Sequence, residues 1–331
     1  MVTNNHQKFI NIKEFYLSVD LIKLKGVTKE YRGHAVLQDV NLKIESGDLF
    51  GIVGQSGSGK TTLLNLVAGF LSPSKGEVVY VSKVTQKERN LKKDLHKIKK
   101  YIGFTPQHNS FYHKLTVLEN LKHFGKLYNV KPSTLKDNIK NLLIFTHLVD
   151  YRHMLAEELS GGMQKRLDLS CSLVHRPKIL ILDEPTADVD PILQKEILFL
   201  LKEVNKQGIT IIIASHHLEG IESICNKIAI IHQGKVHSQG LIDDVKKPFL
   251  KDHFTINMPS NKDKSMLIEK LKKLSIKKIL DNDDNLVIYP DNVESAIGNL
   301  LNIIKEENLL LHDMDIRKPS LREIFENIAK K

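Results

Sequence analysis

The chain lacks any run of about 18 uninterrupted apolar residues, so its sequence predicts no membrane-spanning helix. Residues 1–20 lack the apolar core of a secretory signal. Cysteine occurs twice, at Cys171 and Cys225, and two thiols cannot build the disulfide framework of a small secreted protein. These absences predict a water-soluble protein of the reducing cell interior.

Internal repeats and low-complexity segments are also missing, and the histidines do not follow the spacing of a metal site. The 331 residues are enough for one large domain and a smaller one. Apolar residues make up 41% of the chain and charged residues 27%, as in globular proteins. Length and composition therefore predict two folded domains.

Charge is not balanced along the chain, which has a formal net charge of +10. Residues 83–100 hold eight Lys/Arg against two acids, and residues 262–278 hold seven against two. Solvated helix faces are the simplest explanation, and attraction to an anionic lipid surface or to nucleic acid are the alternatives. Aromatic residues do not alternate with the basic ones, which disfavours single-stranded nucleic acid.

Three regions are expected: an N-terminal extension (1–20), a large α/β domain (21–245) and a small α/β domain (254–331). The boundary follows from the charged stretch that Pro248 interrupts. In the large domain, the apolar runs "ILIL" and "ITIIIAS" are typical of central strands covered on both faces. Its other expected elements are strands within 21–48 and at 49–54 and 101–104, helices at 83–100 and within 116–175, and a hairpin turning at Gln233–Gly234.

The small domain shows an alternation of strand-like and helix-like segments. The expected strands are 254–259, 285–290 and 309–317, and the expected helices are 262–273, 293–306 and 320–329. This order predicts a compact α/β unit.

The stretch "GQSGSGKT", Gly54–Thr61, matches the pattern G-x-x-x-x-G-K-[ST] between a buried strand and an apolar helix. Its backbone N–H groups can surround phosphate oxygens, while Lys60 reaches the β- and γ-phosphates and Thr61 ligates Mg²⁺. The sequence thus predicts a nucleotide site. Its expected residues are Gly54, Gln55, Ser56, Gly57, Ser58, Gly59, Lys60, Thr61 and Thr62.

Two acids, Asp183 and Glu184, end the apolar strand in "ILILDEP". Paired acids after a strand are often an ordinary helix start, but a phosphate-binding loop in the same chain favours a catalytic use. Asp183 is then expected to hold Mg²⁺, and Glu184 to activate the attacking water.

The stretch "LSGGMQKR" (159–166) places Ser160 as a helix N-cap, followed by Gly161 and Gly162. A capped core helix is one interpretation, with Met163, Leu167, Cys171 and Val174 on its buried face. Yet two glycines in a first turn destabilise a helix and permit close backbone approach. Because Gly54–Thr61 already supplies phosphate ligands, a second anion site implies a phosphate from another chain.

"LSGGMQKR" resembles the signature motif of ABC-transporter ATPase subunits, and the resemblance covers residues 21–245. It implies a P-loop NTPase fold of the ABC type, with a mixed sheet, an N-terminal antiparallel β subdomain and a helical signature subdomain. It also implies that two such domains pair head to tail around two ATP molecules. Ser160, Gly161 and Gly162 would then contact the γ-phosphate of the partner's ATP.

The resemblance extends to four further positions. Tyr31 is similar to the aromatic residue that stacks on adenine, with an exposed strand-edge tyrosine as the alternative. Gln107 in "FTPQ" is similar to the glutamine that reaches Mg²⁺ and the attacking water and relays nucleotide state to the membrane subunit. His216 resembles the switch histidine at the γ-phosphate, although the sequence leaves its neighbour His217 open.

The fourth position, Asp190, resembles the acidic residue of the loop that crosses the dimer interface. Here the sequence departs from the family pattern, because Asp188 and Val189 stand where a small residue and leucine are usual. This departure affects the expected packing of the loop and not the expected fold.

Residues 102–130 and the tail "IRKPSLREIFENI" (316–328) resemble ATPase subunits of drug, polysaccharide and lipid exporters. The resemblance implies an ATP- and Mg²⁺-dependent motor subunit, homodimeric or heterodimeric, docked on a separate membrane permease. It would be cytoplasmic and peripheral on the inner face of the cell membrane, and nucleic acid is not expected as a partner.

Three alternatives to an exporter subunit stay open. A soluble ABC ATPase acting on ribosomes or nucleic acid would usually carry tandem domains or coiled-coil insertions, and neither occurs here. An importer ATPase would more often carry a β-barrel C-terminal domain. A non-catalytic binding module is disfavoured because Lys60, Glu184 and His216 are all present.

Overall fold

The computed structural model describes residues 19–82, 87–246, 254–257, 261–272, 274, 276–282, 285–307, 309, 313–315, 321 and 324–325. The chain divides into two compact units, Met1–Ile242 and Asp243–Lys331. None of the described helices is long and apolar enough to span a bilayer.

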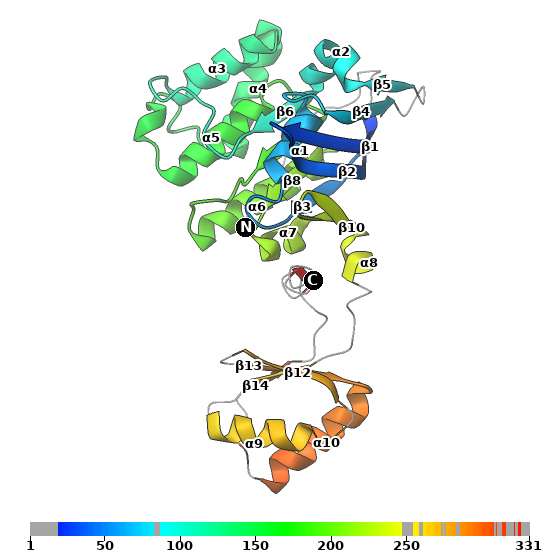
Figure 1. The fold of residues 1–331 in the computed structure, drawn as a ribbon. Helices are drawn as coiled ribbons and strands as arrows, with labels where there is room; N and C mark the ends of the chain where they lie inside the picture. The colour runs from blue at the N-terminus through cyan, green and yellow to red at the C-terminus, as the bar shows by residue number, and fades with distance from the viewer. Residues whose placement is uncertain are drawn as a thin grey trace. The chain divides into compact units, whose positions relative to one another are not determined.

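A six-stranded sheet in the order β10-β9-β3-β8-β7-β6 forms the centre of the first unit (Figure 1). Its strands are β3 Leu49–Val53, β6 Ile102–Thr105, β7 Ile179–Asp183, β8 Thr210–Ser215, β9 Lys227–His232 and β10 Lys235–Leu241. All neighbours pair in parallel except β10, which forms the predicted hairpin with β9. Every residue of β3, β7 and β8 is buried, which explains their continuous apolar runs.

A second, antiparallel sheet has the order β2-β1-β4-β5. It consists of β1 Val19–Tyr31, β2 His34–Glu45, β4 Lys75–Ser82 and β5 Glu88–Asn90. Side chains from this sheet, from the central sheet and from helix α1 (Lys60–Ala68) share one hydrophobic core. Within it, the buried Tyr80 hydroxyl donates to the Val67 carbonyl oxygen at 2.6 Å, which holds β4 against α1.

Three α-helices occupy the region 116–175, as predicted, and Figure 1 shows them grouped together. They are α3 Val117–Leu127, α4 Pro132–Phe145 and α5 Gly161–Leu173. Local sequence explains each start: Thr116 and Glu119 form a capping box for α3, Pro132 begins α4, and Ser160 caps α5. Helices α6 (Pro191–Lys206) and α7 (Leu218–Ile224) pack near β8.

The basic segment 83–100 is helical only in its second half, so the prediction for its first half was wrong where the structure describes it. Glu88–Asn90 is strand β5, which pairs with β4, and helix α2 begins at Leu91 and ends at Ile98. The Asn90 side chain accepts the Lys92 N–H at 3.0 Å and caps the helix. Pairing with a distant strand overrides the local helical preference here.

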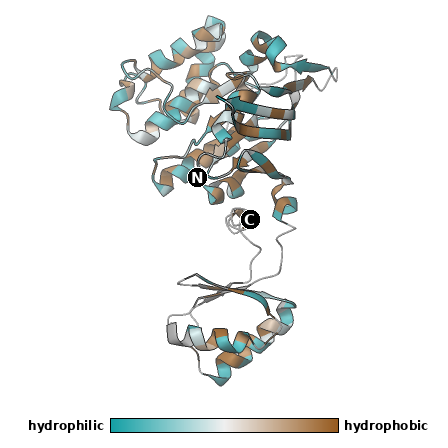
Figure 2. Ribbon diagram, viewed as in Figure 1, coloured by the Kyte–Doolittle hydropathy of each residue, from teal (hydrophilic) through white to brown (hydrophobic). Residues whose placement is uncertain are grey.

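The second unit contains a four-stranded antiparallel sheet in the order β12-β13-β11-β14. Its elements are β11 Phe254–Asn257, α9 Asn261–Leu271, β12 Ile276–Asn282, β13 Asn285–Pro290, α10 Val293–Glu306 and β14 Asp313–Asp315, and a short helix α8, Ile242–Lys246, lies at the boundary. Figure 2 shows apolar residues along α9 and α10, and several of them join the core of this unit. The chain order β-α-β-β-α-β is that of a ferredoxin-like fold.

Strand β12 is missing from the sequence-based prediction, which was wrong on this point. It lies at the edge of the sheet, carries Lys277 and Lys278, and has a register shift after Ile276, so it lacks clean alternation of apolar and polar residues. Most of the predicted final helix, 320–329, lies outside the described residues, but Leu321 and Ile324 are described and fully buried. Of the predicted extension 1–20, residues 1–18 lie outside the described residues, and residues 19 and 20 begin strand β1.

Candidate functional site

Four parallel strands bring the predicted catalytic residues to one edge of the central sheet. Gly54 follows β3, Glu184 follows β7, His216 follows β8, and the Gln107 loop follows β6. Since β3, β8, β7 and β6 are neighbours and run in the same direction, their carboxyl ends share this edge. Ligand sites in such sheets form at this edge.

The loop between β3 and α1 has the geometry of a phosphate site. Gly59, which precedes α1, has φ 103°, and no side chain in the described ranges caps the helix, so its first N–H groups are available to an anion. A Cβ at Gly59 would come within 2.8 Å of Leu37 Cδ2, so glycine is needed for space as well as for conformation.

Lys60 extends along this loop and is buried. Its Nζ donates to the carbonyl oxygens of Gly54 at 2.8 Å and Gln55 at 3.1 Å. Burial lowers the pKa of Lys60, and the nearby carboxylates of Glu184 and Asp183 oppose that shift. The ammonium group therefore lies between the loop and the acids at the end of β7.

Glu184 connects this lysine to the histidine after β8. Its Oε1 lies 3.7 Å from Lys60 Nζ, and its Oε2 lies 2.9 Å from His216 Nδ1 and accepts the His216 backbone N–H at 3.3 Å. Glu184 is buried with φ 49°, a conformation that non-glycine residues rarely adopt and that often occurs at functional sites. The structure thus brings His216 against Glu184. His217 lies at the start of α7, and its buried Nδ1 pairs with none of the described residues.

Asp183 is suited to an oxygen-preferring metal ion. It is 3% exposed and hydrogen-bonds with the Thr61 side chain, while Oδ1 has no hydrogen-bond partner among the residues that the structure describes. Burial raises the pKa of Asp183, and the bond with Thr61 opposes that shift. A buried, unpaired carboxylate oxygen beside a hydroxyl group is a donor set that fits Mg²⁺.

The signature residues form a separate surface. Ser160 Oγ accepts the Met163 N–H at 3.4 Å as an N-cap. Gly161 is exposed, and apart from its own turn of helix no atom of the described residues lies within 4 Å of where a Cβ would stand. At Gly162 a Cβ would come within 2.4 Å of Leu193 Cδ2, so the Leu193 side chain of α6 packs directly against this glycine and would have to shift for a larger residue. An open depression here is lined by residues 160–163, by Arg166 and by residues of the 188–196 segment, and not by the Gly54–Thr61 loop.

Asp190 and Asp188 shape the loop between β7 and α6. Asp190 Oδ1 accepts the N–H groups of Ile192 and Leu193, each at 3.0 Å, and so caps α6. Asp188 has φ 61°, a left-handed conformation that aspartate tolerates better than most residues. That conformation gives a physical reason for the unusual residue at this position.

The two remaining predicted residues are exposed. Tyr31 ends β1 with 42% of its surface exposed, and Lys29 Nζ lies 5.1 Å from its ring centroid. Gln107 lies in the loop after β6, and its carbonyl oxygen accepts a hydrogen bond from Lys165 Nζ at 3.2 Å. Sequence reasoning missed this hydrogen bond to α5. It also missed the fully buried Asp168, which the sequence could have indicated as an acid in the middle of a helix between two leucines.

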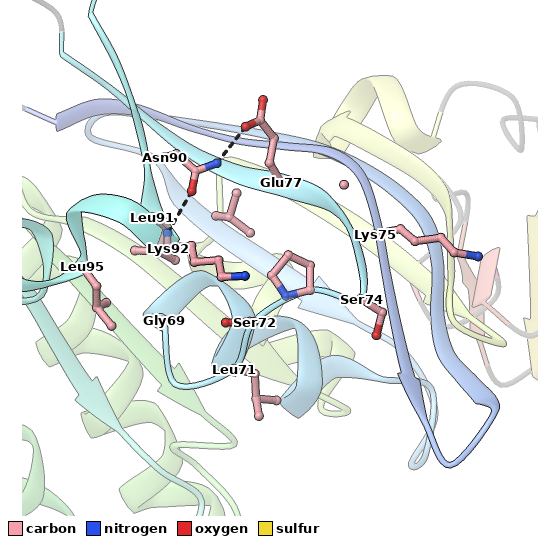
Figure 3. Close-up of a pocket in the computed structure, with 13 residues that line it drawn as sticks. Gly69, Leu71, Ser72, Ser74, Lys75, Glu77, Asn90, Leu91, Lys92 and Leu95 are labelled. Carbon is pink, nitrogen blue, oxygen red and sulfur yellow. Dashed lines mark hydrogen bonds between the residues drawn. The ribbon is translucent and has the colours of Figure 1, made fainter.

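Another pocket lies between the α1–β4 connection and α2 (Figure 3). Asn90 donates to Glu77 Oε2 across it at 2.8 Å, and Leu91 and Leu95 supply apolar walls. None of the predicted nucleotide-binding residues lines it, so this pocket is distinct from the nucleotide site.

Comparison with known proteins identifies the family. The family described as ABC transporter matches residues 37–187. The chain is 27% identical over 311 residues to the linearmycin resistance ATP-binding protein LnrL of Bacillus subtilis, covering 93% of this chain and 98% of LnrL. It is 36% identical over 231 residues to the methionine import ATP-binding protein MetN of Clostridium acetobutylicum, covering 70% of this chain and 71% of MetN.

A solved structure has the same fold. The dimeric ATP-binding cassette MJ0796, bound to ADP and Pi after hydrolysis, is 29% identical with a TM-score of 0.58 and covers 67% of this chain and 98% of its own. The parallel strands, the loop at Gly54–Thr61 and the antiparallel sheet thus occur in the arrangement predicted from the sequence. The chain belongs to the ABC transporter family, in which it is an ATP-binding subunit with ATPase activity.

Proposed function

We propose that this chain drives export through a separate membrane permease. The supporting observation is the length of the alignment with LnrL. It covers 311 residues, more than the first unit, which ends at Ile242, so the likeness extends into the second unit. LnrL is named for resistance to linearmycin, an activity typical of export.

Import is the second candidate, and MetN favours it. MetN is the more similar in sequence, at 36% identity, but that alignment spans 231 residues, fewer than the first unit contains. An alignment of this length is no longer than the ATPase unit, and similarity between ATPase units reports the shared motor rather than the direction of transport. We therefore give more weight to the alignment that includes the second unit.

Within the motor, the residues around β3, β7 and β8 are proposed to bind and hydrolyse ATP. The N–H groups of residues 54–62 hold the phosphates, and Lys60 contacts the β- and γ-phosphates. Glu184 takes a proton from a water molecule as the water oxygen attacks the γ-phosphorus and the bond to the ADP oxygen breaks. Its contact with His216 holds the carboxylate in place.

Asp183, the Thr61 hydroxyl and Gln107 are proposed to hold Mg²⁺. The ion would neutralise charge on the β- and γ-phosphate oxygens. This chain's contribution is to keep Asp183 buried and oriented by its bond with Thr61.

The signature surface is proposed to receive the ATP of a second copy of the chain. Gly161 is open to the outside, and the depression that contains it has no residue from the chain's own phosphate loop. Ser160 and the N–H groups at the start of α5 would then contact the partner's γ-phosphate, with Asp190 at the interface. ATP binding closes the dimer, and product release reopens it.

Tyr31→Ala is expected to weaken ATP binding by about three- to tenfold, because stacking on a base contributes roughly 1 kcal/mol. Tyr31→Phe keeps the ring and should bind like the wild type. The measurement is a titration with a fluorescent ATP analogue. An unchanged dissociation constant for Tyr31→Ala would remove this residue from the adenine site.

The test of the transport assignment is a pull-down of tagged Glu184→Gln protein from detergent-solubilised membranes with ATP and Mg²⁺. We expect recovery of a polytopic membrane protein with about six apolar spans of roughly 20 residues. Lys60→Ala, which should not bind ATP, is the matched control. Recovery of ribosomes or nucleic acid without a membrane protein would contradict the assignment.

The direction of transport needs a second readout, because a permease can serve either direction. A strain without this chain should become more sensitive to amphipathic toxic compounds if the chain drives export. A growth defect that appears only when a nutrient is scarce would favour import instead.

A further inference from the structure

The loop that carries Gln107 is joined to helix α5 by side-chain hydrogen bonds at successive positions. Lys165 Nζ donates to the Gln107 carbonyl oxygen at 3.2 Å. Two residues further along the loop, Asn109 Nδ2 donates to Gln164 Oε1 at 3.1 Å. The loop is thus tied to the first turns of the helix that begins with the signature residues.

The strongest of these links comes from Asp168. Its Oδ1 accepts both the backbone N–H of Ser110, at 3.0 Å, and the Ser110 hydroxyl, at 2.5 Å. Asp168 is fully buried, and within the described part of the chain its Oδ2 has no hydrogen-bond partner. Burial raises the pKa of Asp168, and the Ser110 bonds oppose that shift.

A buried carboxylate is a poor choice for stability alone. Its desolvation is costly, and an apolar residue of similar size in a helix interior is often as stable or more so. What Asp168 supplies is a double acceptor on one atom, which determines both where Ser110 lies and how its backbone is oriented. These two bonds fix the position of the loop segment at Ser110 on helix α5.

The same helix also contacts the strand that precedes the loop. Ser172 Oγ donates to the Phe104 carbonyl oxygen at 2.9 Å, and His175 Nε2 lies 3.1 Å from the Ile102 carbonyl oxygen just beyond the end of α5. The side of α5 that faces β6 and the Gln107 loop is therefore bonded along most of its length.

We infer that Asp168 is a positioning residue that fastens the Gln107 loop to helix α5, so that the loop and the signature residues move as one body. This rests on the proposed function, in which Gln107 reaches the chain's own nucleotide and Ser160 to Gly162 reach the partner's. An α-helix is stiff over this length, so a displacement of the loop shifts the N-terminus of α5 directly. The nucleotide bound to one chain then aligns Ser160 to Gly162 of that chain with the nucleotide bound to the partner chain.

The test compares Asp168→Ala with Asp168→Asn in the full chain. Alanine removes both bonds to Ser110, whereas asparagine keeps an acceptor oxygen in the same place. We expect Asp168→Ala to lower kcat for ATP hydrolysis about tenfold or more, with KM for ATP changed less than about threefold. Asp168→Asn should recover kcat to within about threefold of the wild type.

A second readout is dimer formation with ATP in the Glu184→Gln background, measured by light scattering. Adding Asp168→Ala should raise the concentration needed for dimerisation about tenfold, and adding Asp168→Asn should not. If Asp168→Ala does not fold, Ser110→Ala, which removes the hydroxyl bond and keeps the backbone bond, should lower kcat about threefold with unchanged KM.

The inference would be overturned if folded Asp168→Ala had wild-type kcat and wild-type dimerisation. The same holds for Ser110→Ala where that variant serves as the test. A loss of ATP affinity as large as the loss of kcat would overturn it too, since it would indicate a general structural role. If Glu184→Gln alone fails to dimerise with ATP, the proposed dimer mechanism fails instead, and the kcat comparison still decides the role of Asp168.

Discussion

Glu184→Gln is expected to lower kcat for ATP hydrolysis by about 10²- to 10⁴-fold while leaving ATP binding intact. Glutamine keeps the size of the side chain and an oxygen for the contact with His216, which Glu184 makes at 2.9 Å. It cannot accept a proton from the attacking water. It also removes a buried negative charge that would repel the γ-phosphate.

The same substitution should therefore accumulate an ATP-bound dimer. Phosphate release measures the first effect, and size-exclusion chromatography with light scattering measures the second. Glu203→Gln makes the same chemical change at a carboxylate on α6 that pairs with Lys206, and it should behave like the wild type. Wild-type hydrolysis by Glu184→Gln would show that another group is the base.

Gly161→Glu is expected to abolish most hydrolysis, with kcat reduced by about 10²-fold or more, although each chain still binds ATP. Apart from its own turn of helix, no atom of the described residues lies within 4 Å of a Cβ at Gly161, and Gly161 is exposed, so we expect the chain to fold with the new side chain. The added carboxylate would stand where the proposed partner phosphate binds, and like charges repel in a water-excluded interface. Gly161→Ala is the uncharged control and should retain more activity.

Mixing two inactive variants gives the sharper test of the composite site. Lys60→Ala removes the ammonium group from the phosphate loop and should prevent ATP binding by that chain. In a head-to-tail dimer of Lys60→Ala with Gly161→Glu, one site combines an intact phosphate loop with an intact signature surface. A 1:1 mixture should recover about a quarter of wild-type ATPase activity, because about half the dimers are mixed and each has one intact site of two.

Each variant alone must be inactive for this recovery to be informative, and both must remain folded by circular dichroism. Continued inactivity of the mixture would contradict a site shared between chains. Activity of Gly161→Glu by itself would remove the signature surface from catalysis.

Much of the proposed nucleotide site could be located in the sequence because its residues are consecutive. The backbone of a short glycine-rich loop at a helix start surrounds a phosphate, so "GQSGSGKT" between a strand and a helix carries its own structural context. The acids at the end of "ILILDEP" are equally local, since the apolar run predicts the strand and parallel strands place their ends together. The α/β fold of the large domain could be predicted for the same reason, because its central strands are short consecutive apolar runs.

Other features depended on contacts between residues far apart in the chain. Strand β12 escaped prediction because an edge strand with lysines shows no clean alternation, and its partner β13 supplies the hydrogen bonds. The start of the basic segment became strand β5 because β4 was available to pair with it. Local preference is a weak guide where a distant partner determines the structure.

The sequence by itself determined the family, and it located the proposed phosphate loop and the acids at the end of β7, because those signals lie within a few consecutive residues. The tertiary structure alone decided that His216 and not His217 meets Glu184, and that Leu193 packs directly against Gly162. It also decided that Asp168 holds Ser110. Each of these depends on two segments at least 30 residues apart meeting at hydrogen-bond or van der Waals distance, which packing of the whole unit produces.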